Sequence, residues 1–295
     1  MRIPIGRAMP YHGVMKLSLS VRIAETAAKD RLTIEFDELA RLAVQHGYHA
    51  VCMRPSVVGA RTSEIQRAAV RKTLDRLGLP ISMATTDIAV PLNNQHGPDP
   101  LRDIEPHLDV AAALGTNLIR VCMKNDDDIP WAQRAADQAR ERGIRLAHQC
   151  HTDSLFETVA GALDVFKKVG RQNFGLVYEP ANLMLCGEEH GPKAIKQLAP
   201  YIMNVYVQNH RMNPAGKTSL PTRVRGEVRY DMIPLWEPGG VDFREVFSGL
   251  AEIGYNGYVT VHQAYAESMG PAEAAEKSAE FLRRVGRFEP PKAER

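Results

Sequence analysis

The sequence predicts a single-domain (β/α)8 TIM barrel, an α/β fold in which eight parallel strands alternate with helices. The chain has 295 residues, slightly more than the roughly 250 typical of such a barrel. Short apolar segments alternate with amphipathic ones along most of the chain, and eight of the apolar segments have strand character. No GxGxxG sequence follows the first of them, which disfavours the competing doubly wound sheet.

The predicted strands are short runs rich in apolar or β-branched residues, flanked by turn formers or by helical patterns. They cover residues 16–20, 49–53, 81–84, 117–122, 145–149, 174–178, 202–207 and 257–261. Amphipathic patterns between them predict helices over 36–47, 64–78, 104–115, 131–143, 157–170 and 242–254. Each of these helical segments ends in glycine, a common helix terminator.

The barrel is expected to span residues 15–285, with an N-terminal extension over 1–14 and a C-terminal tail over 286–295. Residues 209–241 are polar and basic, and they predict a long loop after the seventh strand. Loops that follow barrel strands lie at the catalytic face, so this loop is expected either to shape the pocket or to be a solvated, partly mobile segment.

Composition excludes several classes of protein. Lys plus Arg number 37 and Asp plus Glu number 35, so the net charge of +2 disfavours a nucleic-acid binder. No apolar run approaches the roughly 20 residues that cross a bilayer. The four cysteines show no CxxC or other zinc-type spacing, which predicts reduced thiols in a cytoplasmic protein. The sequence gives no signal for an interface between copies of the chain, although homo-oligomers are common among such barrels.

Candidate functional residues follow from the carboxyl ends of the strands, where the active sites of barrels lie. Inward-facing side chains alternate along each strand, so those at the strand ends converge on one pocket. This reasoning brings together Gln149, His151, Glu179, Tyr206 or Gln208, and His262. Imidazole, carboxylate and amide oxygen are ligands of Mn²⁺, Mg²⁺, Zn²⁺ or Fe²⁺.

Other strand-end residues are alternatives with weaker support. Arg54, Asp87 and Lys124 follow the second, third and fourth strands, where each either meets substrate oxygens or is an ordinary surface charge. Asn182 lies just beyond Glu179, and Arg211 opens the long loop. His148 is out of phase with Gln149 and is expected to face the helices.

The segments GGVDFREVFSGLAEIGYNGYVTVH (239–262) and GIRLAHQCHTDSLFETVAGALDVFKKVGRQNFGLVYEPANL (143–183) resemble the xylose-isomerase-like barrel superfamily. That resemblance implies sugar isomerases and epimerases with one divalent metal held by Glu, Asp, His and Glu at strands five to eight. The first Glu falls on Gln149, the Asp on Glu179, the His on Tyr206 and the last Glu on His262. Gln208 or His210 could substitute for the missing strand-seven ligand.

These departures change the expected chemistry. Gln149 can offer a metal its oxygen but cannot accept a proton, so the two-Glu mechanism of the epimerases does not transfer directly. The sequence therefore predicts metal ligation by Gln149, Glu179, Gln208 and His262. Catalysis is assigned to His151, His262 and Glu179, and substrate contacts to Arg54, Lys124, Asn182, Tyr206 and Arg211.

The resulting functional prediction is a metal-dependent isomerase or epimerase of a sugar-like polyol or keto acid in carbohydrate metabolism, working by proton transfer beside a carbonyl. A lyase of the same superfamily, either a dehydratase or an enzyme that cleaves carbon-linked glycosides, remains an alternative. The second alternative is a degenerate barrel that binds a ligand or a partner without catalysis. A superfamily endonuclease is disfavoured, because such enzymes hold three metals with many more His and acidic ligands than this rim offers.

Overall fold

Eight parallel strands close into a barrel in the computed structural model, which describes residues 13–265 and 269–291. The strand order around the barrel is β1-β11-β7-β6-β5-β4-β3-β2. The strands are β1 (Lys16–Ser20), β2 (Ala50–Met53), β3 (Ile81–Thr85), β4 (Leu118–Val121), β5 (Arg145–Gln149), β6 (Phe174–Tyr178), β7 (Ile202–Val207) and β11 (Tyr258–Val261). The predicted (β/α)8 fold is therefore confirmed, and each predicted strand overlaps an observed one.

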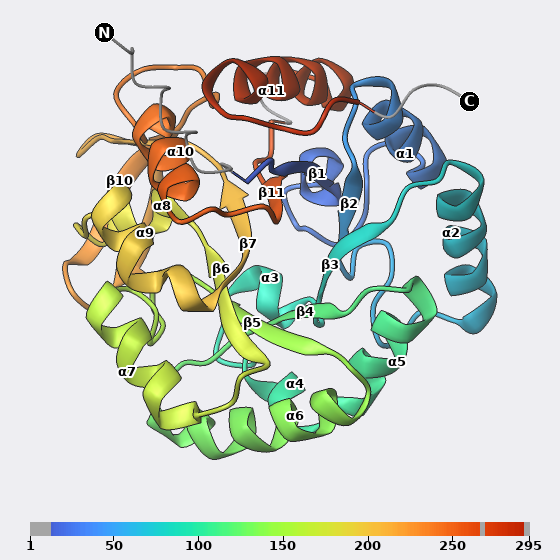
Figure 1. Ribbon diagram of the computed structural model, residues 1–295, viewed down its shortest axis with the longest axis horizontal. Coiled ribbons are helices and arrows are strands. Elements are labelled where there is room, and N and C mark those ends of the chain that lie inside the picture. Colours follow the sequence, from blue (N-terminus) through green and yellow to red (C-terminus); the bar gives the residue numbers. More distant parts are fainter. Residues whose placement is uncertain (1–12, 266–268, 292–295) are drawn as a thin grey trace, which may run out of the picture.

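Helices form a ring around the strands (Figure 1). They are α1 (Phe36–Gln45), α2 (Glu64–Arg76), α5 (Glu105–Leu114), α6 (Ile129–Glu141), α7 (Val159–Val169), α9 (Pro192–Leu198), α10 (Phe243–Glu252) and α11 (Pro271–Val285). Short helices α3 (Ala89–Leu92), α4 (Asp99–Arg102) and α8 (Pro180–Leu185) follow β3 and β6. Gly115 and Gly170 end α5 and α7 at positive φ, the left-handed conformation that favours glycine at this position.

The alternation of side chains along each strand determines what fills the barrel. An inner layer of apolar side chains comes from six neighbouring strands and comprises Cys52, Met83, Leu118, Ala147, Val177 and Tyr206. The residues that alternate with them pack outward in the larger core beneath the helices. Side chains two positions beyond the inner layer face the same cavity one level closer to its carboxyl-terminal mouth.

The two ends of the barrel domain meet beside β1. Met15 pairs with Phe288, and the backbone N–H groups of Met15 and Glu289 donate hydrogen bonds of 3.0 and 2.8 Å that join these two segments. The described part of the predicted tail thus lies against the start of the barrel. Most of the predicted extension, residues 1–12, is outside the described residues, and the domain boundaries stay a prediction.

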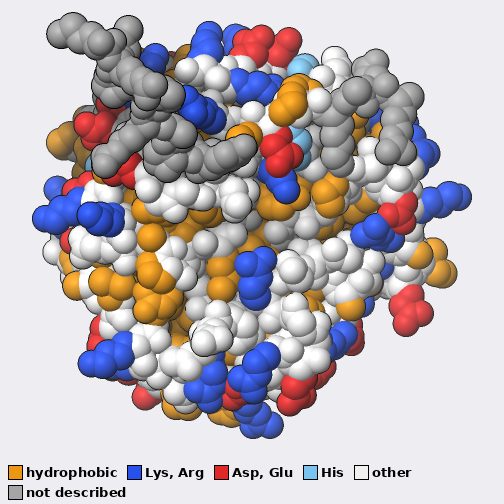
Figure 2. Space-filling model, viewed as in Figure 1, with side chains coloured by type: hydrophobic (Ala, Val, Ile, Leu, Met, Phe, Trp, Pro, Cys, Tyr) orange, Lys and Arg blue, Asp and Glu red, His pale blue; other side chains and the backbone are white. Residues whose placement is uncertain are grey.

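The surface carries no extended region of one charge on the face drawn in Figure 2, where acidic and basic side chains alternate around the rim. None of the helices in the described part of the chain is both long and apolar enough to cross a bilayer.

The long segment after β7 is not the loop that the sequence predicts. It folds into a three-stranded antiparallel sheet in the order β8 (His210–Met212), β10 (Gly226–Met232) and β9 (Thr218–Thr222). In β10, buried Val228 and Tyr230 alternate with exposed Glu227 and Arg229. Val228 and Tyr230 pack with Leu185 of α8, so one face of the sheet is anchored to the barrel. The many charged residues on the other face hide this short alternation in the sequence.

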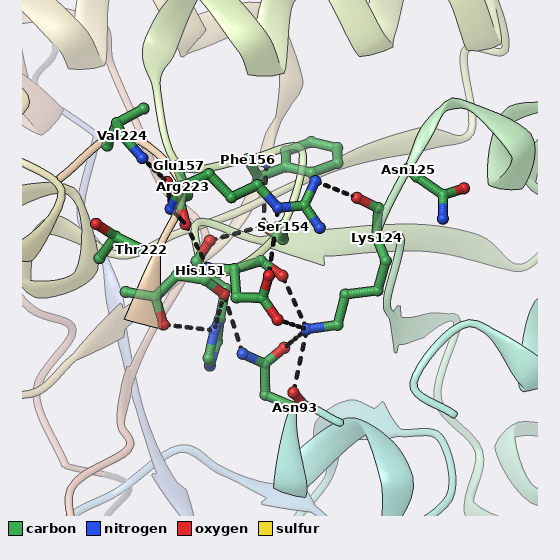
Figure 3. Close-up of polar contacts among 12 residues, drawn as sticks. Asn93, Lys124, Asn125, His151, Ser154, Phe156, Glu157, Thr222, Arg223 and Val224 are labelled. Atoms are coloured by element: carbon green, nitrogen blue, oxygen red, sulfur yellow. Dashed lines mark hydrogen bonds and ion pairs between the residues drawn. The ribbon is translucent and has the colours of Figure 1, made fainter. Parts of the chain in front are cut away.

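A buried carboxylate fastens the tip of this sheet to the barrel (Figure 3). Both oxygens of Glu157 accept hydrogen bonds of 2.9 Å from the backbone N–H of Arg223, and the backbone N–H of Val224 adds a third at 3.1 Å. The Arg223 guanidinium donates to the Lys124 carbonyl and pairs with Asp153 at 3.3 Å. The loops after β4 and β5 and the turn between β9 and β10 are thereby held together.

We predict that Glu157→Gln lowers the free energy of unfolding by about 1–3 kcal/mol, because an amide has one acceptor oxygen where the carboxylate has two and cannot accept from the backbone N–H groups of Asp153, Arg223 and Val224 together. Chemical denaturation measures the change. Glu227→Gln is the matched control, since Glu227 lies exposed on the same sheet in a surface ion pair with Arg229, and it should change stability by less than about 0.5 kcal/mol. Equal effects of the two substitutions would contradict the fastening role.

Candidate active site at the carboxyl end of the barrel

Glu179 is at the centre of the candidate site. It follows β6 directly, and Pro180 starts α8 immediately after it, so the strand ends at this carboxylate. Its side chain is fully buried and accepts hydrogen bonds from three amides. Gln149 and Gln208 donate from the ends of β5 and β7, and Asn182 Nδ2 donates over 2.8 Å from α8. Of the residues predicted to converge, Gln149 and Gln208 contact Glu179 directly, whereas no hydrogen bond or ion pair in the described residues joins His262 to it.

The environment of Glu179 changes its acidity. Burial raises the pKa of this carboxyl to about 7, opposed by the hydrogen bonds from Gln149 and Gln208 and by the positive charge of Arg120. Both protonation states of Glu179 are therefore populated near neutral pH. A carboxyl group of this kind can both accept and return a proton.

His262, at the end of β11, is held as a neutral imidazole. Its ring stacks on Tyr206 with 3.9 Å between the centroids. Nδ1 lies 3.1 Å from Ser20 Oγ, and Nε2 lies 3.4 Å from a terminal nitrogen of Arg54. Since a guanidinium can only donate, Nε2 is the acceptor and Nδ1 carries the proton. Burial and the neighbouring Arg54 and Arg120 lower the pKa of His262 well below its usual value.

Arg54 is fixed by a buried ion pair. Its Nε donates to Glu25 Oε1 over 2.8 Å, and both side chains are almost fully buried. Ser56 donates to the same oxygen over 2.6 Å, and Arg22 lies 3.5 Å from the other carboxylate oxygen. The sequence reasoning singled out Arg54 but did not identify its partner Glu25, which lies on the segment between the first strand and the first predicted helix.

Arg120 is the residue of this site that the sequence reasoning missed. It lies on β4, two positions after Leu118 of the inner layer, and is only 4% exposed. Its guanidinium carbon is 5.9 Å from the ring centre of Tyr206. The run LIRV contained the signal, because an arginine in phase with an inward leucine must point into the barrel.

Two other predicted residues, Lys124 and Arg211, lie elsewhere or have different roles. The ammonium group of Lys124 donates to Asn93 and Asp153 through four contacts of 2.7–3.1 Å (Figure 3), which use all of its donors. The structure thus corrects the predicted substrate contact of Lys124, which instead holds loops together. Arg211 is exposed on β8, 4.0 Å from Asp231, and no contact in the described residues joins it to Glu179.

The remaining predicted residues line or support the site. His151 is half-buried beyond β5, and its Nδ1 lies 3.0 Å from the Thr152 carbonyl. Burial, with Arg120 adding to it, lowers the pKa of His151 well below the usual value. Tyr206 lies deeper, with its hydroxyl 3.2 Å from Cys52 Sγ. His148 faces outward as predicted and stacks on Phe156 with 3.9 Å between the ring centroids.

The donor set does not fit a divalent cation. Both glutamines turn their amide N–H groups, and not their oxygens, toward Glu179, and His262 Nε2 faces a guanidinium. Gln149 Oε1 points away from this contact and is buried without a hydrogen-bond partner. Among the described residues, no group of three or more His, Cys, Asp or Glu side chains is placed to hold a metal ion. This arrangement departs from the predicted metal site at Gln149, Glu179, Gln208 and His262.

A cavity of about 450 Å³ opens at the same face. It lies between the three-stranded sheet and the segments that follow β1 and β11, and its lining includes Arg22, Glu25, Lys217, Asp231 and Gln263. Glu25 connects this cavity to the buried Arg54, so a small molecule held here would lie close to the barrel mouth.

The sequence of the chain matches a family of known proteins. A model described as "Xylose isomerase-like TIM barrel" matches residues 40–285. An inosose dehydratase from Geobacillus thermodenitrificans is 24% identical over 163 residues, a match that spans about half of each protein, 52% of this chain and 52% of that one.

Solved structures share the fold at low sequence identity. The probable 3-DHS dehydratase AsbF from Bacillus anthracis has a TM-score of 0.69 at 16% identity, covering 91% of this chain and 99% of that one. The IOLI protein with a bound zinc atom has a TM-score of 0.67 at 16% identity, covering 93% and 99%. D-allulose 3-epimerase from Methylomonas sp. has a TM-score of 0.64 at 17% identity, covering 95% and 100%.

The relatives thus include dehydratases and an epimerase, and one solved structure holds zinc. With a closed eight-stranded barrel and a family match over most of its length, the chain belongs to the xylose isomerase-like TIM barrel family.

Proposed function

We propose that this protein is an isomerase or epimerase that moves a proton at the carbon beside the carbonyl of a polyhydroxylated, sugar-like substrate. The observation that carries this proposal is Glu179, a fully buried carboxyl at the end of β6 that receives three amide hydrogen bonds and titrates near neutral pH. A base with a pKa near the working pH is the most effective kind for such a proton transfer.

In the proposed reaction, ionised Glu179 takes the proton from the carbon, and the C–H electrons move to the carbonyl oxygen to give an enediolate. Return of the proton to the former carbonyl carbon, while the hydroxyl proton of the enediolate passes to the other oxygen, yields an isomer. Delivery of a proton from water to the opposite face of the original carbon yields an epimer, and Glu179 then releases its proton to the hydroxide that remains. Arg54 and Arg120 stabilise the negative charge on the enediolate. The free Gln149 Oε1 is suited to accept a hydrogen bond from a substrate hydroxyl.

No step of this reaction is assigned to a metal ion, because the donors around Glu179 do not fit one. The zinc in the structure of the IOLI relative supports divalent-metal chemistry elsewhere in the family. For this chain the nearby guanidinium groups supply positive charge.

Dehydration is the second candidate, favoured by the match to an inosose dehydratase. It would share the first step. Glu179, now carrying the substrate proton, would then give it to the hydroxyl group on the next carbon, and that group would leave as water while a C=C bond forms. Isomerisation and dehydration thus require the same base and differ in where the proton goes.

We predict that Glu179→Gln slows proton exchange by about 10²–10⁴-fold, since the amide cannot accept a proton. The measurement is NMR detection of deuterium uptake from D₂O beside the carbonyl of D-allulose, D-fructose, an inosose and 2-keto-D-gluconate. New signals distinguish an isomer or epimer from a dehydrated product.

Glu227→Gln, on the exposed face of β10, is the control and should leave the exchange rate unchanged. A folded Glu179→Gln variant with the exchange rate of the wild type would refute the assignment of Glu179. Absence of exchange with every compound would favour the degenerate, ligand-binding barrel.

We also predict a pH effect on stability that depends on Glu179. Burial raises its pKa from 4.5 to about 7, so between these values the folded protein binds more protons than the unfolded chain. The free energy of unfolding therefore falls as pH rises through this window, by about 1.4 kcal/mol for each unit of the pKa difference.

Urea denaturation of the wild type and Glu179→Gln on either side of this window tests the effect. The variant should lose about 1–3 kcal/mol less stability than the wild type as pH rises through the window. The same pH dependence in both proteins would show that Glu179 titrates normally in the folded state.

A further inference from the structure

Arg120 carries a buried charge that the protein leaves without a partner. The residue is 4% exposed, and its Nε is buried without a hydrogen-bond acceptor. Among the described residues, the guanidinium makes no hydrogen bond or ion pair, and its carbon lies 5.9 Å from the ring centre of Tyr206. Burying an unpaired guanidinium is unfavourable, and a bound anionic ligand would supply the missing partner.

The charges around Arg120 do not compensate it. Glu25 is shared by Arg54 and Arg22, at 2.8 and 3.5 Å. Lys29 adds a further positive charge and donates to the neutral Pro91 carbonyl over 3.1 Å. Glu179, the other buried carboxyl of the site, accepts hydrogen bonds from three amides and makes no ion pair among the described residues. The barrel mouth therefore has an excess of positive charge.

The position of Arg120 relative to Glu179 also suits a ligand. Arg120 pairs in register with Ala147 on β5, whose next inward residue is Gln149, and Glu179 follows on β6. The strands that carry Arg120 and Glu179 are two steps apart, or about 10 Å, and the length of the arginine side chain shortens the gap between the functional groups. A small molecule with an anionic end can contact Arg120 while a carbon a few bonds away lies beside Glu179.

We propose that Arg120 binds a carboxylate of the substrate, so that the substrate is a polyhydroxylated monocarboxylic acid rather than a neutral sugar. This inference rests on the proposed function, because it names the substrate class of the same site. The planar guanidinium matches a carboxylate in shape and can bind it through two parallel hydrogen bonds.

The test compares acids with their neutral counterparts by calorimetry and thermal shift in the presence of EDTA. D-gluconate is compared with D-sorbitol, 2-keto-D-gluconate with D-fructose, and inorganic phosphate tests the alternative anion. We expect the wild type to bind at least one acid tenfold or more tightly than its neutral counterpart and more tightly than phosphate.

Substitution of Arg120 then tests the assignment to this residue. Arg120→Met should abolish the preference for the acid, and Arg120→Lys should retain part of it, because lysine keeps the charge but not the planar fork. Arg134→Met is the control, since Arg134 is exposed on α6, and should keep the wild-type preference. Arg120→Met should also raise the melting temperature of the ligand-free protein, because it removes an unpaired buried charge.

Three results would overturn the proposal. These are a wild type with no preference for either acid, an Arg120→Met variant that keeps the preference, and a loss of melting temperature in Arg120→Met, which would show that Arg120 is structural. Tight acid binding without deuterium exchange would leave the carboxylate site standing and refute the proposed function. Deuterium exchange on neutral sugars, without a binding preference for the acids, would support the proposed function and refute the carboxylate site.

Discussion

The strict alternation of side chains along eight short parallel strands is the constraint on which the rest of the site depends. Once Leu118, Ala147 and Val177 fill the inner layer, the residues two positions later have to point into the mouth of the barrel. That geometry brings Arg120, Gln149 and Glu179 together from segments far apart in sequence. It also buries these groups away from solvent, so every charge needs a partner inside the protein or in a ligand.

The low-dielectric mouth of the barrel explains the chemistry of the individual groups. Burial raises the pKa of Glu179 to about 7, whereas burial and nearby guanidinium groups keep His262 neutral. One group thus remains ready to exchange a proton while the other is fixed as an acceptor. Arg54 is paired with Glu25, whereas Arg120 makes no ion pair among the described residues, so its charge is available to a bound molecule.

Much of the fold could be predicted from the sequence, because strand and helix periodicity are local properties. The phase of β5 and β6 likewise predicted that Gln149 and Glu179 meet. Two features were not predicted because they depend on contacts between distant segments or on a weak pattern. Lys124 is occupied by residues of two distant loops, and the three-stranded sheet has a short and highly charged alternation. Arg120 differs from these, because its phase with Leu118 in β4 is present in the sequence.

The central claim is that a guanidinium, and not a metal ion, provides the positive charge that faces the substrate beside Glu179. A crystal structure with 2-keto-D-gluconate, grown with Mg²⁺ and Zn²⁺ present, tests it most directly. The carboxylate should lie within hydrogen-bond distance of Arg120, with a substrate carbon next to Glu179 and no cation between them. A metal ion coordinated by Glu179, Gln149 and His262, with Arg120 remote from the ligand, would contradict it.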